Sequence, residues 1–278
     1  MESTEQIPFI HIQPARKWLS LDVGELWVYR ELIYFLIWRD IKVRYKQTAI
    51  GAAWAILQPL LMMVIFTLVF QYIAKIQSDG VPYPVFAYTA LLPWSFFSGA
   101  LSRCSASVAQ QANLVSKVYF PRLIAPLSAT VSGIVDFAIS FALLALMLAW
   151  YGIMPTWGVL ALPVLLFLAL MTALSVGLWL SALHVKYHDV GHLIPFLVQM
   201  WMYASPVAYP VSEIPEKWRL IYSLNPMVGV IEGFRWALLG TQRPDFRVMA
   251  VSISCVFALL FAGVIYFKRM ERSFADVI

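Results

Sequence analysis

The residues with the clearest chemistry are four cations that lie between a short apolar stretch and the first long one: Arg39, Lys42, Arg44 and Lys46. Guanidinium groups bind planar oxyanions through paired hydrogen bonds, and lysine ammonium groups bind phosphates as point charges. The cluster therefore indicates a site for an oxyanion. The same cations would also suit anchoring to anionic lipid headgroups and the setting of membrane topology, and both interpretations stay open.

A metal site is not predicted from the histidines and cysteines. Three histidines recur at every fourth position and would share one face of a helix: His184, His188 and His192. Asp189 is the only carboxylate beside them, which leaves this set short of the usual ligands. Cys104 and Cys255 lie in separate apolar stretches and form neither a metal-binding nor a disulfide pattern.

Two charged residues are expected within apolar stretches. Asp136 lies in the middle of one of them, where a carboxylate is costly unless it faces protein or water. It is therefore either a functional group or a paired group in a dimer interface. Arg103 lies near the inner end of another stretch, from which its long side chain can reach the headgroups.

No GxxxxGK[ST] run occurs in the sequence, so no P-loop is predicted in this chain. If ATP drives its function, another subunit must bind the nucleotide.

The elements that must position these residues are membrane helices. Of the 278 residues, 61% are hydrophobic and 13% are charged, whereas soluble domains carry about 25% charged residues. Apolar runs of roughly 20 residues, long enough to cross a hydrocarbon layer, recur along the chain. Continuous runs indicate helices, because barrel strands would alternate over about 10 residues. The chain is thus expected to be an all-α integral membrane protein.

Six membrane-spanning helices are predicted, after a tail and a helix that do not span. The tail, residues 1–24, lacks the pattern of a cleaved signal peptide, which places the N-terminus in the cytoplasm. Residues 25–47 predict an amphipathic interfacial helix, because their apolar stretch is too short to span and cations follow it. A permease domain at residues 48–270 and a cytoplasmic C-terminal tail at 271–278 complete the chain. The predicted spans are 52–74, 85–108, 123–150, 157–183, 193–209 and 248–267.

The distribution of charge supports this topology. Most of the 20 Lys and Arg fall on the side expected to be cytoplasmic, which agrees with the positive-inside rule and places both termini inside. The net charge of +5 is therefore ascribed to topology and membrane lipids, and not to nucleic acid.

One outer segment, residues 210–247 between the fifth and sixth spans, departs from the charge pattern. Its two helical stretches break at Asn225-Pro226, and each is too short to cross. We expect a re-entrant helix pair that borders a pathway, since backbone at membrane depth must pack against protein or line a wet cavity. The expected gate residues in this pair are Pro226, Glu232 and Arg235.

The sequence around the cation cluster resembles the entry signature of type-two ABC permeases that export polysaccharides and polyol phosphates. The signature is WRDIKVRYKQ at 38–47 followed by GAAWAILQPL at 51–60. Further matches are LLPWSFF at 91–97, KVYFPR at 117–122, HVKYHDV at 184–190, SPV at 205–207 and NP at 225–226. The resemblance covers nearly the whole chain after the N-terminal tail.

This resemblance implies a permease that moves lipid-linked polysaccharide across the bacterial inner membrane. O-antigen is the expected cargo, with capsule or teichoic acid chains as alternatives. The permease would not be an enzyme and would bind no cofactor, because ATP and Mg belong to a separate nucleotide-binding subunit present in two copies. A second copy of this chain would complete the pathway. The cation cluster would capture the pyrophosphate of the lipid-linked glycan at the cytoplasmic gate.

The resemblance also implies roles for two further sets of residues. An inner loop at about 109–122 and the turn after the fourth span would seat on the ATPase, although plain connecting loops are the alternative. The expected coupling residues are Lys117, Tyr119, Phe120, Arg122, Lys186 and Asp189. Aromatic planes can stack on the C–H faces of sugars, and the channel candidates by position are Trp54, Tyr88, Trp94, Phe97, Trp201 and Tyr203.

Two rival functions are kept. One is an ABC permease for another cargo, such as a drug or a small lipid. The other is a membrane-embedded glycan ligase or acyltransferase, which would need convergent carboxylates or a His and Asp pair near one membrane face. The outer segment holds acidic residues but no histidine: Glu213, Glu216, Glu232 and Asp245.

Overall fold

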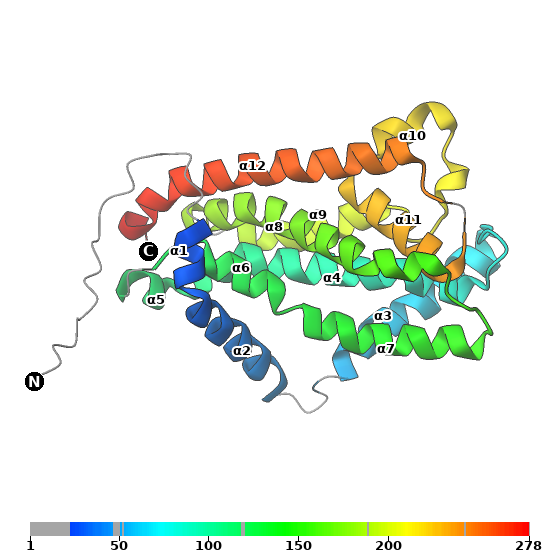
Figure 1. Ribbon diagram of the computed structural model, residues 1–278, viewed down its shortest axis with the longest axis horizontal. Helices are drawn as coiled ribbons and strands as arrows, with labels where there is room; N and C mark the ends of the chain where they lie inside the picture. Colours follow the sequence, from blue (N-terminus) through cyan, green and yellow to red (C-terminus); the bar gives the residue numbers. More distant parts are fainter. Residues whose placement is uncertain are drawn as a thin grey trace, which may run out of the picture.

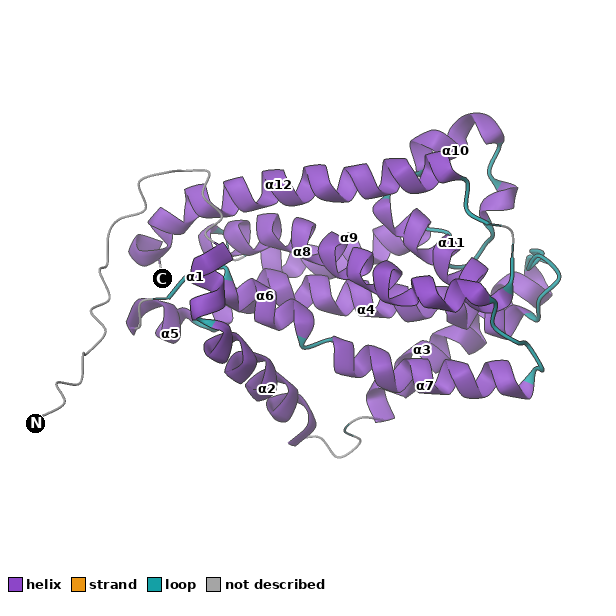
Figure 2. Cartoon of the chain, in the orientation of Figure 1, coloured by secondary structure: helices purple, strands orange, loops and turns teal. Residues whose placement is uncertain are grey.

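The computed structural model describes residues 23–46, 51, 53–117, 120–187, 189–241 and 243–277. Within these ranges all regular secondary structure is helical, as Figure 2 shows, which confirms the expected all-α class. Most of the long helices run along one common axis and form an elongated bundle (Figure 1). The predicted N-terminal tail lies almost wholly outside the described residues.

Two helices precede the bundle, α1 (Val23–Val28) and α2 (Arg30–Lys46). The bundle and its connections contain the following elements in chain order: α3 (Ala53–Phe66), its π-helical continuation η1 (Thr67–Ile73), α4 (Tyr83–Gln110), α5 (Ala112–Lys117), α6 (Ile124–Val131), α7 (Ile134–Trp150), the 3-10 helix η2 (Trp157–Ala161), α8 (Leu162–Lys186), α9 (Val190–Tyr203), the 3-10 helix η3 (Val211–Glu213), α10 (Glu216–Tyr222), α11 (Pro226–Leu239) and α12 (Phe246–Val277).

Five helical segments in the described part of the chain are long and apolar enough to cross a membrane. They correspond to the expected first, second, third, fourth and sixth spans, and they are Ala53–Ile73, Tyr83–Gln110, Ile124–Trp150, Trp157–Lys186 and Phe246–Glu271. The chain is therefore a multi-pass membrane protein.

The expected fifth span is not one long helix. Helix α9 has 14 residues, about 21 Å at 1.5 Å per residue, which is short of the roughly 30 Å hydrocarbon layer. The helix ends before Pro206, which has no amide proton to continue it. The chain then runs through turns to Pro210, and the hydroxyl of Tyr83 donates to the carbonyl of Ala208 at 2.7 Å. Residues 204–210 thus reach the N-terminal end of α4 without helical structure.

The expected third span is interrupted at Ser132 and Gly133, which separate α6 from α7. Glycine and serine pairs commonly mark such breaks, and the hydroxyl of Ser132 donates back to the carbonyl of Ala129 at 2.9 Å. Asp136 consequently lies in the first turn of α7, near the middle of the apolar segment Ile124–Trp150. The positive end of the helix dipole favours a carboxylate at this place.

Helix α4 is the scaffold of the bundle. It contacts α3, α6, α7, α8 and α11, and 78% of its apolar window is buried, compared with 11% for Ala53–Ile73. Small residues permit the close approach of neighbouring helices. A Cβ at Gly177 of α8 would lie 2.4 Å from the sulfur of Cys104, so only glycine fits there.

The predicted interfacial helix at 25–47 is two helices, because Tyr29 separates α1 from α2. Helix α2 lies at an angle to the bundle and contacts α6 (Figure 1). Leu36 of α2 is buried in the core, whereas three large apolar side chains of the same helix are exposed: Tyr34, Phe35 and Trp38. Trp27 of α1 is exposed as well. The apolar side chains of α2 are therefore spread around the helix and not gathered on one face, so the expected amphipathic character is not found in Arg30–Lys46.

The predicted helix pair broken at Asn225-Pro226 is confirmed as α10 and α11. Asn225 caps α11 by accepting from the amide of Met227 at 3.1 Å. It also accepts from the indole of Trp201 at 2.9 Å and donates to the carbonyl of Ala204 at 2.9 Å. One side chain therefore ties the start of α11 to the end of α9.

Candidate functional site

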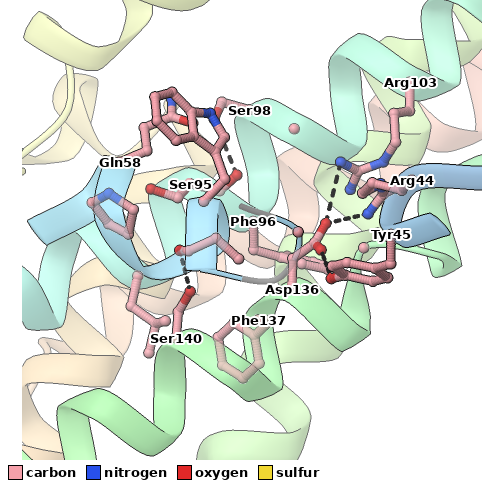
Figure 3. Close-up of a pocket in the computed structure, with 17 residues that line it drawn as sticks. Arg44, Tyr45, Gln58, Ser95, Phe96, Ser98, Arg103, Asp136, Phe137 and Ser140 are labelled. Carbon is pink, nitrogen blue, oxygen red and sulfur yellow. Dashed lines mark hydrogen bonds and ion pairs between the residues drawn. The ribbon is translucent and has the colours of Figure 1, made fainter. Parts of the chain in front are cut away.

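Two cavities follow one another along α4 and share Arg44 and Arg103 in their walls. The larger has a volume of about 590 Å³ and lies between α2, α3, α4 and α7 (Figure 3). The smaller, about 490 Å³, extends toward the C-terminal end of α4 and is also lined by Gln110 and Gln111. Both volumes fall in the range of roughly 300–1,000 Å³ that is usual for ligand sites.

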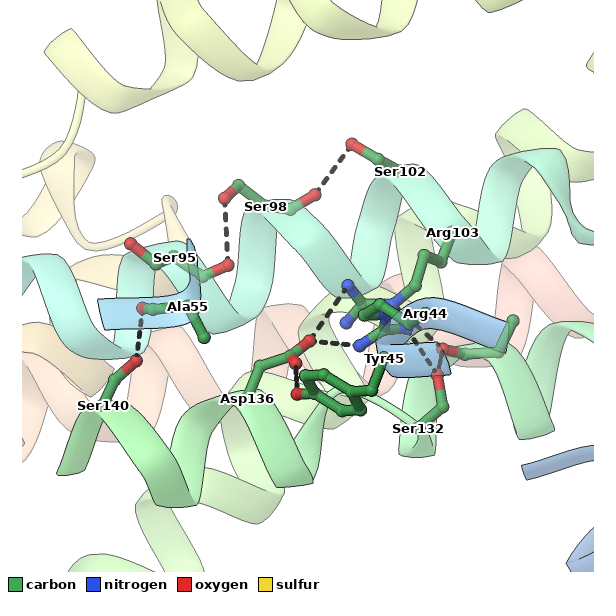
Figure 4. A network of polar contacts seen from close by, with 11 residues as sticks. Arg44, Tyr45, Ala55, Ser95, Ser98, Ser102, Arg103, Ser132, Asp136 and Ser140 are labelled. Atoms are coloured by element: carbon green, nitrogen blue, oxygen red, sulfur yellow. Dashed lines mark hydrogen bonds and ion pairs between the residues drawn. The ribbon is translucent and has the colours of Figure 1, made fainter. Parts of the chain in front are cut away.

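Asp136 is the centre of an ion cluster that joins three helices. A guanidinium nitrogen of Arg44 donates to one carboxylate oxygen, and the hydroxyl of Tyr45 donates to the other (Figure 4). The Nη1 atom of Arg103 lies 3.7 Å from the oxygen that Arg44 contacts. The side chains of Arg44, Asp136 and Arg103 are 26%, 26% and 27% exposed. Two cations thus share one partly buried carboxylate.

Two glycines make room for the guanidinium of Arg103. A Cβ on Gly133 would lie 2.0 Å from its Nη2 atom, and a Cβ on Gly99 would lie 3.0 Å from its Nη1 atom. The Nε atom of Arg103 donates to the carbonyl of Ala129 at 3.3 Å. Arg103 therefore points into the space between the helices, and the expectation that it simply extends to the headgroups misses this inward placement.

The environment of Tyr45 keeps its phenol protonated. Burial, followed by the hydrogen bond to Asp136 and the charge of that carboxylate, raises the pKa of Tyr45 from 10.0 to about 12. The tyrosine is thus a hydrogen-bond donor to Asp136 at physiological pH.

The structure divides the four predicted gate cations into two groups. Arg39 and Arg44 line the cavities, and Arg39 is paired with Asp40 at 2.9 Å. Lys42 and Lys46 are exposed, and the ammonium of Lys42 lies 5.3 Å from the ring centre of Trp38. The two arginines are therefore placed for a ligand in the cavities, whereas the lysines face away from the protein core.

The predicted channel aromatics are not gathered in one place. Trp54 lines the larger cavity. Three of the others on α4 are buried in the protein core: Tyr88, Trp94 and Phe97. Trp201 packs against Phe97 with ring centres 5.0 Å apart, and Tyr203 is exposed.

Two aromatic residues that line the larger cavity were not among the candidates, Phe96 and Phe137. Phe96 follows Leu92 by four residues and precedes Gly99 by three, so all three share one face of α4 with Arg103. This spacing was a usable signal for the cavity face of α4.

The predicted coupling residues that the structure describes flank the ends of α5 and α8, which lie with the C-terminal ends of α4 and α12 at one end of the bundle (Figure 1). Lys117, Lys186 and Asp189 are exposed, whereas Phe120 is buried against the core. The backbone amide of Arg122 donates to the carboxylate of Glu271 at 3.3 Å. Tyr119 lies outside the described residues. Phe120 therefore packs within this chain, whereas the charged side chains of Lys117, Lys186 and Asp189 face outward.

The predicted gate residues of the outer segment are a packing unit. Pro226 begins α11 and is buried. Arg235 is 1% exposed, forms an ion pair with Glu232 at 3.2 Å, and lies over the ring of Phe86 at 3.7 Å. Its nitrogens also donate to the carbonyls of residues 207 and 209, at 3.0 and 3.2 Å. The arginine thus satisfies the non-helical backbone that follows α9.

No group of three His, Cys, Asp or Glu side chains suited to a metal occurs among the residues that the structure describes. His188 falls outside them. The Nδ1 atom of His184 lies 3.2 Å from the carbonyl oxygen of Ser105, a contact that joins α8 to α4.

The fold and the site define a multi-pass membrane protein with cavities between its helices that are lined by charged side chains. The chain belongs to the ABC-2 type transporter family, whose model matches residues 31–239. This range contains the Asp136 cluster and extends from α2 to α11. The chain is therefore the non-catalytic transmembrane subunit of a transporter that works with an ABC ATPase.

Three curated relatives are similar over most of this chain. It is 30% identical to the O-antigen export system permease protein RfbA of Myxococcus xanthus, over 92% of this chain and 98% of the relative. It is 23% identical to the polysialic acid transport protein KpsM of Escherichia coli, over 86% and 93%. It is 22% identical to the capsule polysaccharide export inner-membrane protein CtrC of Neisseria meningitidis serogroup B, over 88% and 93%. The chain is thus an ABC-2 permease related to polysaccharide exporters.

Proposed function

We propose that this chain exports a lipid-linked polysaccharide, with O-antigen as the first candidate, from the cytoplasmic side of a bacterial inner membrane. The observation that carries the proposal is its full-length similarity to permeases named for O-antigen, polysialic acid and capsule export. The relative at 30% identity is named for O-antigen export, which favours that cargo over capsule or teichoic acid chains.

Six crossings are proposed, with both termini in the cytoplasm. Five are the long apolar helices. The other is α9 together with residues 204–210, since this segment begins beside the end of α8 and reaches Tyr83 at the start of α4. Backbone of this kind is tolerated at membrane depth where protein satisfies it, and Tyr83 and Arg235 supply donors to its carbonyls. Helices α10 and α11 would then re-enter from the outer side.

The transporter is proposed to contain two copies of this chain and two copies of the ATPase. The first apolar span is only 11% buried within one copy, so its apolar face is available to lipid or to a second copy. Trp54 on the same helix borders the larger cavity. A pathway between the copies would place this cavity at its wall.

The chemistry of the site suits a lipid-linked glycan that enters with its phosphates first. Arg39 and Arg44 would bind the pyrophosphate, because guanidinium groups form paired bonds with phosphate oxygens. Aromatic rings at the larger cavity would contact sugar faces, from Trp54, Phe96 and Phe137. Lys117, Lys186 and Asp189 would transmit the closure of the ATPase dimer, and Pro226, Glu232 and Arg235 would hold the outer segment.

The proposal is tested by removing this chain from its native host and measuring where the glycan accumulates. We expect surface polysaccharide to disappear and its lipid-linked form to collect on the cytoplasmic side. Restoration of export by the unmodified chain, but not by the chain with a hydrolysis-deficient ATPase, would support ATP-driven transport. Unchanged surface polysaccharide, together with loss of export of a drug or small lipid, would establish the rival cargo.

A further inference from the structure

We propose that Arg44 and Arg103 form a two-arginine seat for the phosphate of a lipid, and that Asp136 occupies this seat until the lipid enters. The proposal rests on the proposed function for the source of the phosphate, but the seat itself is an inference from the geometry. It adds one cation, Arg103, to the cations that the sequence pointed to, and it assigns Asp136 as the carboxylate that they contact.

The first argument is the position of the two arginines. They come from different helices, α2 and α4, and both line both cavities. A group that passes from the smaller cavity to the larger must therefore pass their guanidinium groups. Figures 3 and 4 show both side chains directed at Asp136 from the side of α4 and α2.

The second argument is the balance of charge. The charged residues that line the two cavities are three arginines and two aspartates: Arg39, Arg44, Arg103, Asp40 and Asp136. Arg39 is paired with Asp40 at 2.9 Å, and Asp136 is the carboxylate within ion-pair distance of both Arg44 and Arg103. Its contact with Arg103 is long, 3.7 Å. A phosphate or diphosphate offers more oxygens and more charge than one carboxylate and would engage both guanidinium groups.

The third argument is the space reserved for Arg103. Any Cβ at Gly133 would overlap its guanidinium, with 2.0 Å to the Nη2 atom, and Gly99 leaves similar room on the other side. An arginine that only extended to the headgroups would need no such space. The two glycines thus leave room for the guanidinium of Arg103 at the junction of the cavities.

Displacement of Asp136 has a mechanical consequence. Arg44 and Tyr45 lie in the last turn of α2, and both contact Asp136 at the start of α7. A phosphate that takes over the guanidinium of Arg44 would leave the hydrogen bond of Tyr45 as the remaining contact of this turn with Asp136. Arrival of the lipid would in this way loosen the helix that stands beside the cavities.

The test uses the permease and its ATPase purified together in lipid nanodiscs, with a polyprenyl diphosphate that carries no sugar as the probe. Neutral phosphatidylcholine forms the nanodisc, and phosphatidylglycerol is the competitor. The variants are Arg103→Gln, Gly133→Ala and Asp136→Asn, and Arg30→Gln is the matched control, because Arg30 is an exposed cation at the far end of α2.

We expect Arg103→Gln to weaken probe binding at least tenfold, and Gly133→Ala to weaken it severalfold by displacing the guanidinium without removing charge. Asp136→Asn should tighten binding, because the competing carboxylate is gone, and Arg30→Gln should change nothing. Weak competition by phosphatidylglycerol assigns the seat to the carrier lipid. Equal competition assigns it to membrane phospholipid.

Two results would contradict the proposed seat. In the first, Arg103→Gln leaves probe binding unchanged. In the second, Asp136→Asn weakens probe binding as much as Arg103→Gln does. If Arg103→Gln does not assemble, Gly133→Ala tests the seat in its place, because Gly133→Ala retains every charged group. The probe has no sugar, so failure here is separate from failure of the export assay, which tests the polysaccharide cargo.

Discussion

Arg44 in the last turn of α2 donates to the carboxylate of Asp136 in the first turn of α7, although 92 residues separate them in the sequence. The contact fixes a helix that the composition places at the membrane surface to a helix that spans it. The site therefore depends on the geometry of α2 relative to the bundle, and its energetic coupling is measurable.

A double-mutant cycle on this pair should show coupling. We expect Arg44→Gln and Asp136→Asn each to lower the free energy of unfolding, and the double variant to lose less than the two together by about 1 kcal/mol, since contacting charged pairs couple at this scale. Unfolding in mixed detergent micelles gives the four values. Arg44→Gln combined with Asp189→Asn, which lies in the turn between α8 and α9, serves as the additive control. If the changes in the free energy of unfolding for Arg44→Gln and Asp136→Asn also add, the two side chains are not energetically coupled.

The stability of the protein should depend on Tyr45 at high pH. Its pKa is about 12 in the folded protein and 10.0 for an ordinary tyrosine. The unfolded chain therefore loses this proton first as the pH rises. The contribution of Tyr45 is complete below about pH 10 and is lost between pH 10 and 12.

The measurement is the unfolding midpoint of the unmodified protein and of Tyr45→Phe across this range. The difference between them should be constant up to pH 10, and the unmodified protein should then lose stability relative to the variant. Because all other titrating groups are shared, they cancel in the comparison. Parallel curves to pH 12 would contradict the raised pKa.

Arg235 should be a structural requirement for the outer segment. Its removal leaves Glu232 without its partner and two backbone carbonyls without a donor, and breaking a buried pair in this way costs about 3–5 kcal/mol. We expect Arg235→Gln to reduce the amount of folded permease severely. Arg243→Gln is the control, since Arg243 is exposed beside Trp236. Normal yield and midpoint for Arg235→Gln would show that the segment does not need the arginine.

Contact with the ATPase should depend on charge at one end of the bundle. Reversal of two exposed residues, Lys186→Glu with Asp189→Lys, is expected to weaken assembly two- to fivefold, because exposed ion pairs are worth about 0.2–1 kcal/mol each. Co-purification at low and high salt measures the effect, which should shrink as salt screens the charges. Lys217→Glu, on α10 at the opposite end, is the control. A larger effect from Lys217→Glu would place the ATPase elsewhere.

The sequence predicted the parts of the fold that follow from local composition. Apolar length identified five of the spans, and the Asn225-Pro226 break located α10 and α11. Pro206 was a usable signal for the end of α9, because it cannot continue a helix. The sequence did not show how the non-helical backbone after α9 is satisfied, since that depends on contacts of Tyr83 and Arg235 from other helices.

The site was predicted only in part, for a similar reason. Arg39 and Arg44 could be identified because four cations follow one another in one short stretch. Arg103 and Asp136 are isolated charges in apolar surroundings, and their pairing arises from the crossing of α2, α4 and α7. Phe120 shows the reverse case, since its place between cations suggested an exposed contact but tertiary packing buries it.

The capture of a lipid-linked phosphate by the arginines beside α2 is the central claim, and ATP hydrolysis by the reconstituted transporter tests it most directly. Lipid-linked polysaccharide should stimulate hydrolysis by the unmodified complex and by Arg30→Gln. The double variant Arg39→Gln with Arg44→Gln should lose at least nine-tenths of the stimulation, measured relative to its own basal rate and at equal protein level, since guanidinium groups bind phosphate directly. Equal stimulation of the double variant and the unmodified complex would contradict the claim.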